Sequence, residues 1–170
     1  MPRSAGLYID GTMPFINGDA PMIVGADEAV LPPRAGVEAV LAFLPVFEDP
    51  RFLPEVVVAE EEGWTLEQYT REVYEFERTL YRAGFVVRFD WSRWEPEAFR
   101  YYRDPFLLAN AGCCEIRRLL TFHVRKNVIC EGHLAVMLRD GHIEAILRRL
   151  AALADGLADE ADALRPTARF

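Results

Sequence analysis

Residues 112–154 read GCCEIRRLLTFHVRKNVICEGHLAVMLRDGHIEAILRRLAALA. Apolar residues recur in this stretch at intervals of three or four, which predicts helices over residues 112–126, 132–140 and 142–154. Gly141 separates the last two helices. The inward-facing residues of the first helix are expected to be Cys113, Ile116, Leu120 and either His123 or Val124. Those of the last helix are expected to be Ile143, Ile146, Leu147 and Leu150. Three consecutive amphipathic helices predict a fold that is mainly α-helical.

The preceding segment adds a long helix and a strand. Thr65-Leu66-Glu67-Gln68 fits a capping box, and an apolar stripe follows it as far as Gly84, which predicts one helix beginning at Thr65. Residues 85–91 alternate apolar and polar side chains, as a strand does, and its partner is either segment 55–58 or an N-terminal hairpin. With shorter helices near 37–44 and 95–103, the prediction is an α+β, mainly α-helical fold of five to six helices.

The length of 170 residues fits a single domain. We expect residues 36–164 to form one compact helical domain, followed by a frayed tail over residues 165–170. Residues 1–35 are rich in proline and glycine, and Asp10-Gly11 lies between two apolar triplets. That pattern predicts an N-terminal arm or hairpin extension.

Composition narrows the class of protein. No apolar run approaches the roughly 18 residues that a membrane-spanning helix needs, so no membrane contact is expected. The three cysteines are an odd number, and Cys113 and Cys114 are adjacent, a spacing that disulfide geometry fits poorly. Reduced thiols and a cytoplasmic location are the expectation.

Charge is distributed unevenly along the acidic chain. The formal net charge is −8, with −9 on residues 1–90 and +1 on residues 91–170. Overall acidity disfavours binding to nucleic acid, which depends on neutralising phosphates. A basic face within residues 117–149 keeps nucleic-acid binding as a further alternative. Its residues would be Arg117, Arg118, Arg125, Lys126, Arg148 and Arg149.

All cysteines and histidines lie between residues 113 and 142. Cys130 and His133 are three residues apart, so on one helix they would share a face and could bind zinc together with His123. A metal-binding protein or an enzyme that uses this segment is therefore the main alternative. The simpler interpretation is that no cofactor is bound and that the cysteines pack as small apolar side chains.

A second candidate site is a ligand pocket with an aromatic floor. Stacked aromatic rings next to an arginine can bind flat molecules through stacking and cation–π contacts. The candidate ligand-binding residues are Trp91, Arg93, Trp94, Arg125 and His133. The simpler interpretation is that the aromatic side chains only pack in the core. A concave pocket that holds one of these tryptophans with one of the basic residues would favour the ligand site.

From about residue 37 to residue 150 the chain resembles an uncharacterised family of bacterial and archaeal domains of unknown function. The resemblance rests on residues 73–76 (VYEF), 89–94 (FDWSRW), 119–127 (LLTFHVRKN), 131–134 (EGHL), Gly141 and residues 146–150 (ILRRL). The chain departs from the family pattern at Val128-Ile129, where Arg-Phe often stands. The resemblance implies a compact, mainly helical fold and no particular activity.

No constellation of catalytic residues emerges from this sequence. Together with the uneven charge and the apolar N-terminal arm, this favours a non-catalytic protein that binds another macromolecule. The expected partner is another protein or a second copy of the chain.

Overall fold

The computed structural model describes residues 28–61 and 64–163, and the predicted mainly helical α+β class is confirmed. The elements of the described ranges are α1 (Arg34–Leu41), α2 (Leu44–Phe47), β1 (Glu55–Glu61), β2 (Trp64–Tyr69), α3 (Arg71–Arg82), α4 (Glu95–Arg103), α5 (Pro105–Ala109), α6 (Cys113–Ile129), α7 (His133–Arg139) and α8 (His142–Ala163). These are eight helices in the described ranges, where five to six were predicted. The short helices α2 and α5 account for the excess.

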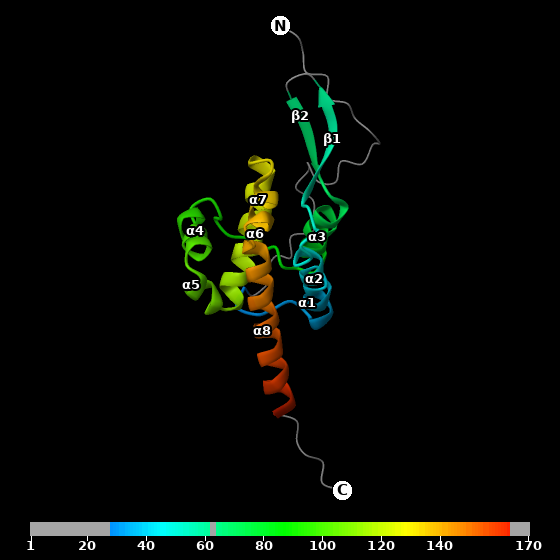
Figure 1. The fold of residues 1–170 in the computed structure, drawn as a ribbon. Coiled ribbons are helices and arrows are strands. Elements are labelled where there is room, and N and C mark those ends of the chain that lie inside the picture. Colours follow the sequence, from blue (N-terminus) through cyan, green and yellow to red (C-terminus); the bar gives the residue numbers. More distant parts are fainter. Residues whose placement is uncertain (1–27, 62–63, 164–170) are drawn as a thin grey trace.

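Helix α8 organises the core. It packs against α1, α2, α5, α6 and α7, and it runs through the middle of the molecule in Figure 1. Its predicted inward residues are fully buried, and so are Ile116 and Leu120 of α6. Gly84, Gly132 and Gly141 each have positive φ angles at helix boundaries, a conformation that glycine adopts without steric cost. The three C-terminal helices were therefore predicted correctly, but Cys113, which was expected to face inward, is only partly buried.

Strands β1 and β2 form an antiparallel hairpin that projects from the helical body (Figure 1). The prediction of a helix beginning at Thr65 is therefore wrong in its first six residues. Residues 64–69 pair with β1, from Glu61 opposite Trp64 to Glu55 opposite Tyr69, and α3 begins at Arg71. The ladder of the hairpin satisfies the backbone groups that a capping box would otherwise have satisfied.

Segment 85–91 is not a strand, so the predicted β element at this position is also wrong, as is its pairing with residues 55–58. The alternation did mark a buried side, since Phe85 and Val87 are buried while Arg88 is exposed. The segment crosses α6 in an extended path, and the backbone groups of Phe85 and Val87 bond to the Thr121 side chain of α6 rather than to a neighbouring strand.

The predicted N-terminal arm and the frayed tail fall mainly on residues 1–27 and 164–170, which lie outside the described ranges. In the part that is described, no helix has both the length and the apolar character needed to cross a lipid bilayer.

Candidate functional site

A pocket lies between segment 87–91 and the last turns of α6. Its volume is about 310 Å³. Its lining residues are Val87, Arg88, Phe89, Trp91, Arg125, Val128 and Ile129. The lining thus combines aliphatic and aromatic side chains with two guanidinium groups, and it contains no carboxylate, thiol or imidazole.

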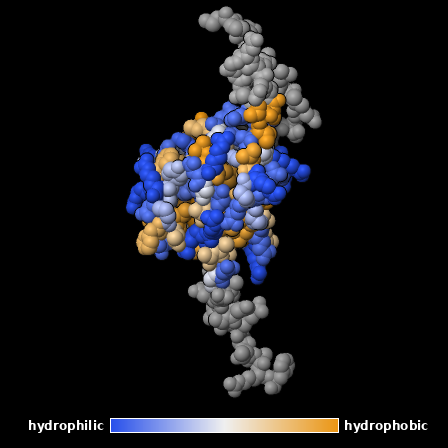
Figure 2. Space-filling view, in the orientation of Figure 1, coloured by the Kyte–Doolittle hydropathy of each residue, from blue (hydrophilic) through white to orange (hydrophobic). Residues whose placement is uncertain are grey.

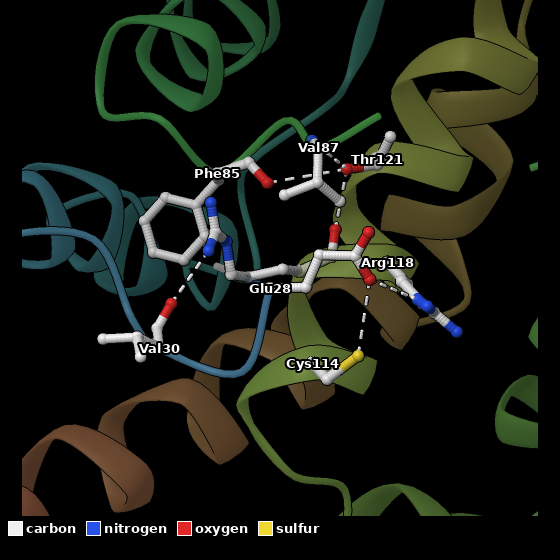
Figure 3. Close-up of polar contacts among 8 residues, drawn as sticks. Glu28, Val30, Phe85, Val87, Cys114, Arg118 and Thr121 are labelled. Atoms are coloured by element: carbon white, nitrogen blue, oxygen red, sulfur yellow. Dashed lines mark hydrogen bonds and ion pairs between the residues drawn. The ribbon is translucent and has the colours of Figure 1, made fainter. Parts of the chain in front are cut away.

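Buried polar side chains of α6 hold the wall of this pocket in place. The Thr121 hydroxyl accepts a hydrogen bond from the backbone N–H of Val87 at 3.0 Å, and Arg117 donates one to the carbonyl oxygen of Gly84 at 2.7 Å. Figure 3 shows Thr121 facing Phe85 and Val87 from α6. Because Thr121 and Arg117 are almost completely buried, these bonds fix the path of segment 85–91.

The aromatic wall is connected to the first residues that the structure describes. Arg118 forms an ion pair with Glu28 at 2.8 Å, and its guanidinium lies 5.2 Å from the centre of the Phe89 ring. Glu28 also lies 3.6 Å from the sulfur of Cys114, as Figure 3 shows. Burial raises the pKa of the Cys114 thiol. Arg118 is therefore occupied on two sides and supports the pocket rather than facing into it.

Arg88 and Arg125, the two arginines that line the pocket, differ from Arg118 in their contacts. The guanidinium of Arg125 lies 5.8 Å from the centre of the Tyr81 ring. Burial raises the pKa of Tyr81, and the positive charge of Arg125 acts in the opposite direction. Among the described residues, neither Arg125 nor Arg88 has an ion pair with a carboxylate. No carboxylate in the described part of the chain therefore competes with an external anion for either guanidinium group.

The structure brings together two of the predicted ligand-binding residues. Trp91 and Arg125 line the same pocket, and the Trp91 ring packs 6.3 Å from the ring of Phe122. Trp94 lies outside the pocket, between the rings of Phe89 and Tyr101. Arg93 is exposed and forms an ion pair with Asp90 at 3.3 Å. The fifth candidate, His133, also lies outside the lining and belongs to a cluster of histidines.

His123, His133 and His142 come together from α6, α7 and α8. His123 Nδ1 lies 3.0 Å from His133 Nε2, and the rings of His123 and His142 are 5.0 Å apart. Burial lowers the pKa of all three imidazoles, that of His142 to about 4. The cluster is therefore neutral at pH 7. His123 and His142 are buried in the core, His123 being 2% exposed, and His133 is partly buried at its edge.

The candidate zinc ligands are only partly brought together. His123 and His133 are in contact, whereas Cys130 is exposed at the end of α6. Across residues 28–61 and 64–163, no three side chains of His, Cys, Asp or Glu are placed to hold a metal ion. This geometry gives no support to a zinc site built from Cys130, His123 and His133.

The basic residues proposed for nucleic-acid binding are mostly engaged within the molecule. Arg117 and Arg149 donate to backbone carbonyl oxygens at 2.7 to 2.8 Å. Arg118, Lys126 and Arg148 form ion pairs with glutamates at 2.7 to 2.8 Å. Arg125, at the pocket, contacts the Tyr81 ring and, among the described residues, has no ion pair, whereas Arg118 combines a ring contact with Phe89 and an ion pair with Glu28. These residues therefore do not present a continuous cationic surface.

Four lining residues, Val87, Arg88, Val128 and Ile129, were not predicted as ligand-binding residues. Val87 and Arg88 were assigned only to a predicted strand, and Val128 and Ile129 were noted only where the chain departs from the family pattern. The structure shows Val128 and Ile129 70% and 65% exposed. Single exposed apolar residues are common on protein surfaces, so the sequence holds no signal that would separate this pair from the core.

The comparisons with known proteins assign a family and no activity. The sequence profile of a family described as "Family of unknown function (DUF6508)" matches residues 32–156, which is more than half of the chain. No curated protein matches, and no solved structure matches.

Proposed function

Because the chain belongs to the family of unknown function DUF6508, whose description names no activity, we propose its function from the geometry of the pocket. The chain is a non-catalytic binding protein that engages a partner protein at the pocket and at the exposed end of α6. The observation that carries this proposal is the meeting of Trp91 and Arg125 in one cavity of about 310 Å³.

The chemistry of the lining supports binding rather than catalysis. General acid–base or nucleophilic chemistry needs a titratable or nucleophilic side chain within reach of the substrate. The side chains around this pocket are aliphatic, aromatic or guanidinium groups. The histidine cluster is a poor substitute, because His123 and His142 are buried and all three histidines lie outside the lining.

Exposed apolar residues support a protein as the partner. Many of the exposed apolar residues that the structure describes lie on neighbouring elements. They are Val56, Val57 and Val58 on β1, Val128 and Ile129 at the end of α6, and Val136 on α7. Tyr69 at the base of the hairpin bonds to Asn127 of α6, and Glu55 of β1 pairs with Arg139 of α7. Figure 2 shows an apolar patch at the hairpin end of the molecule. Exposed apolar patches are typical of surfaces that bind other proteins.

A cytoplasmic location belongs to the same proposal. Cys113, Cys114 and Cys130 are all free, and Cys130 is exposed. Free, exposed thiols fit a reducing compartment better than an oxidising one.

Selection from a displayed peptide library would test the proposal. The wild-type protein serves as bait, and the double variant Val128→Asp with Ile129→Asp serves as counter-bait. The matched control is Phe106→Asp on α5, which also places a carboxylate at an exposed apolar position, since Phe106 is 79% exposed. We expect peptides that bind the wild type and the Phe106→Asp variant but not the double variant.

Two outcomes would contradict the proposal. One is that no peptide is enriched on the wild type. The other is that the enriched peptides bind the double variant equally well, while urea unfolding shows all three proteins to be folded. Light scattering at low and high salt separates the case in which the partner is a second copy, because peptides that match the chain itself would then accompany a dimer.

A further inference from the structure

We propose that the pocket recognises a short acidic and aromatic segment of the partner, with an aromatic ring placed against Trp91 and a neighbouring carboxylate held by Arg88 and Arg125. This inference rests on the proposed function and specifies the chemistry of its partner. It follows from the charge of the pocket, from its apolar floor and from its size.

The charge argument begins with the contrast between the pocket and the chain. The protein carries a formal net charge of −8, yet the charged groups that line the pocket are two arginines. Elsewhere on α6, Arg118 and Lys126 are paired with glutamates. A guanidinium presents N–H donors in a planar fork that fits a carboxylate, and charge-assisted bonds of this kind are the stronger ones. The pocket therefore favours an anionic group and disfavours a lysine or an arginine.

The floor of the pocket selects the group attached to that anion. The ring of Trp91 packs against the ring of Phe122. The ring of Phe89 contacts the guanidinium of Arg118 and the ring of Trp94. Rings fixed in this way offer contact area without further loss of side-chain freedom on binding. Exposed Val128 and Ile129 extend the apolar surface at the edge of the pocket. A ligand with an aromatic side chain beside a carboxylate complements both parts of the lining. The ring would contact the apolar residues, and the carboxylate would bind the two arginines.

The size of the pocket indicates that it accommodates one or two side chains of a partner rather than a large ligand. Small-molecule sites range from roughly 300 to 1,000 Å³, and this pocket of about 310 Å³ is at the lower end. A short peptide segment that places one ring and one carboxylate in the pocket, while its backbone follows the end of α6, matches that volume.

Synthetic hexapeptides, acetylated and amidated at their ends, provide the test. The probe has the sequence Gly-Glu-Phe-Glu-Gly-Ser. One control peptide replaces both glutamates by glutamine, and another replaces the phenylalanine by alanine. Binding is followed by titration of the ¹⁵N-labelled full chain, with the backbone amide of Trp91 as the reporter at the site. We expect the acidic aromatic peptide to bind about tenfold more tightly than either control peptide.

Variants of the protein assign that preference to the two arginines. Arg125→Gln and Arg88→Gln should each reduce the preference for glutamate over glutamine, and Arg125→Lys should restore part of it because it keeps the charge. Arg93→Gln is the matched control, since Arg93 lies two residues beyond Trp91, outside the pocket, and pairs with Asp90. The preference should survive in that variant.

The inference is overturned if the glutamate and glutamine peptides bind equally, or if Arg125→Gln leaves the preference unchanged in a folded protein. It is also overturned if an eight-nucleotide oligothymidylate shifts the pocket signals and the peptide does not. These failures are distinct from failure of the proposed function. A library selection that enriches neutral peptides dependent on Val128 and Ile129 would keep the binding role and remove only the acidic and aromatic specificity.

Discussion

Arg117 belongs to the basic residues of α6, but the structure gives it a buried structural role. It is 3% exposed, and it donates hydrogen bonds to the carbonyl oxygens of Val30 and Gly84 at 2.8 and 2.7 Å. The guanidinium thus joins α6 to two segments that are distant in the sequence. A buried, hydrogen-bonded charge of this kind has a structural role.

Replacing Arg117 by methionine should lower the free energy of unfolding by about 2–4 kcal/mol, because two buried carbonyl groups would lose their charged donor. Urea unfolding measures the change. The control is Arg148→Gln, which breaks the exposed ion pair with Glu48 and should cost less than about 1 kcal/mol. Equal losses in the two variants would show that Arg117 contributes no more than a surface charge.

The candidate pocket could be predicted in part from single residues. The sequence identified Trp91 and Arg125 as ligand-binding candidates because it placed an aromatic cluster and a basic helix in the same domain. It could not exclude Trp94 or Arg93, since their separation from the pocket depends on how segment 85–91 turns into α4. The path of segment 85–91 also places the exposed side chain of Arg88 in the pocket lining. The alternation of this segment did not predict that Arg88 would lie beside the end of α6.

At the level of elements, the errors arise where partners far apart in the sequence decide the structure. Residues 64–69 have a local pattern that fits a helix start, yet pairing with β1 gives them a strand. Segment 85–91 has strand alternation, yet its backbone bonds to the side chain of Thr121 in α6 and not to a neighbouring strand. Helices α6, α7 and α8 were predicted because their apolar periodicity and their separating glycines are local signals.

The hairpin is connected to the helical body through Asn127. Its side-chain oxygen accepts from the Tyr69 hydroxyl at 2.5 Å and from the backbone N–H of Leu134 at 3.1 Å. We expect Tyr69→Phe to cost about 1 kcal/mol and Asn127→Ala about 1–3 kcal/mol. The double variant should cost less than the sum of the two, because both changes remove the same bond. Hydrogen exchange should show faster opening of β2, and additive losses would contradict this connection.

At the scale of the whole molecule, the three histidines join the helices that form the core. They come from α6, α7 and α8, and burial keeps the pKa of each imidazole low. Lys126 adds to the depression of the His133 pKa, while Glu95 opposes it, and Asp140 opposes the depression of the His142 pKa. The unfolded chain binds protons on these groups below a pH of about 6.5, whereas the folded chain binds them only at a lower pH. Stability should therefore fall as the solution becomes acidic.

The pKa of about 4 for His142 allows a quantitative prediction. Between about pH 7.5 and pH 5, its contribution to the free energy of unfolding should fall by about 2 kcal/mol, and the loss should be complete only below about pH 4. Half-buried Glu77 and buried Glu144, whose pKa values are raised by desolvation, act in the opposite direction as the pH falls. The difference between wild type and His142→Phe isolates the histidine, since phenylalanine cannot titrate. Urea unfolding at several pH values should show a weaker acid dependence in that variant, and His142→Gln provides a second non-titrating comparison. Equal acid dependence in all three proteins would mean that protonation of His142 is not coupled to unfolding.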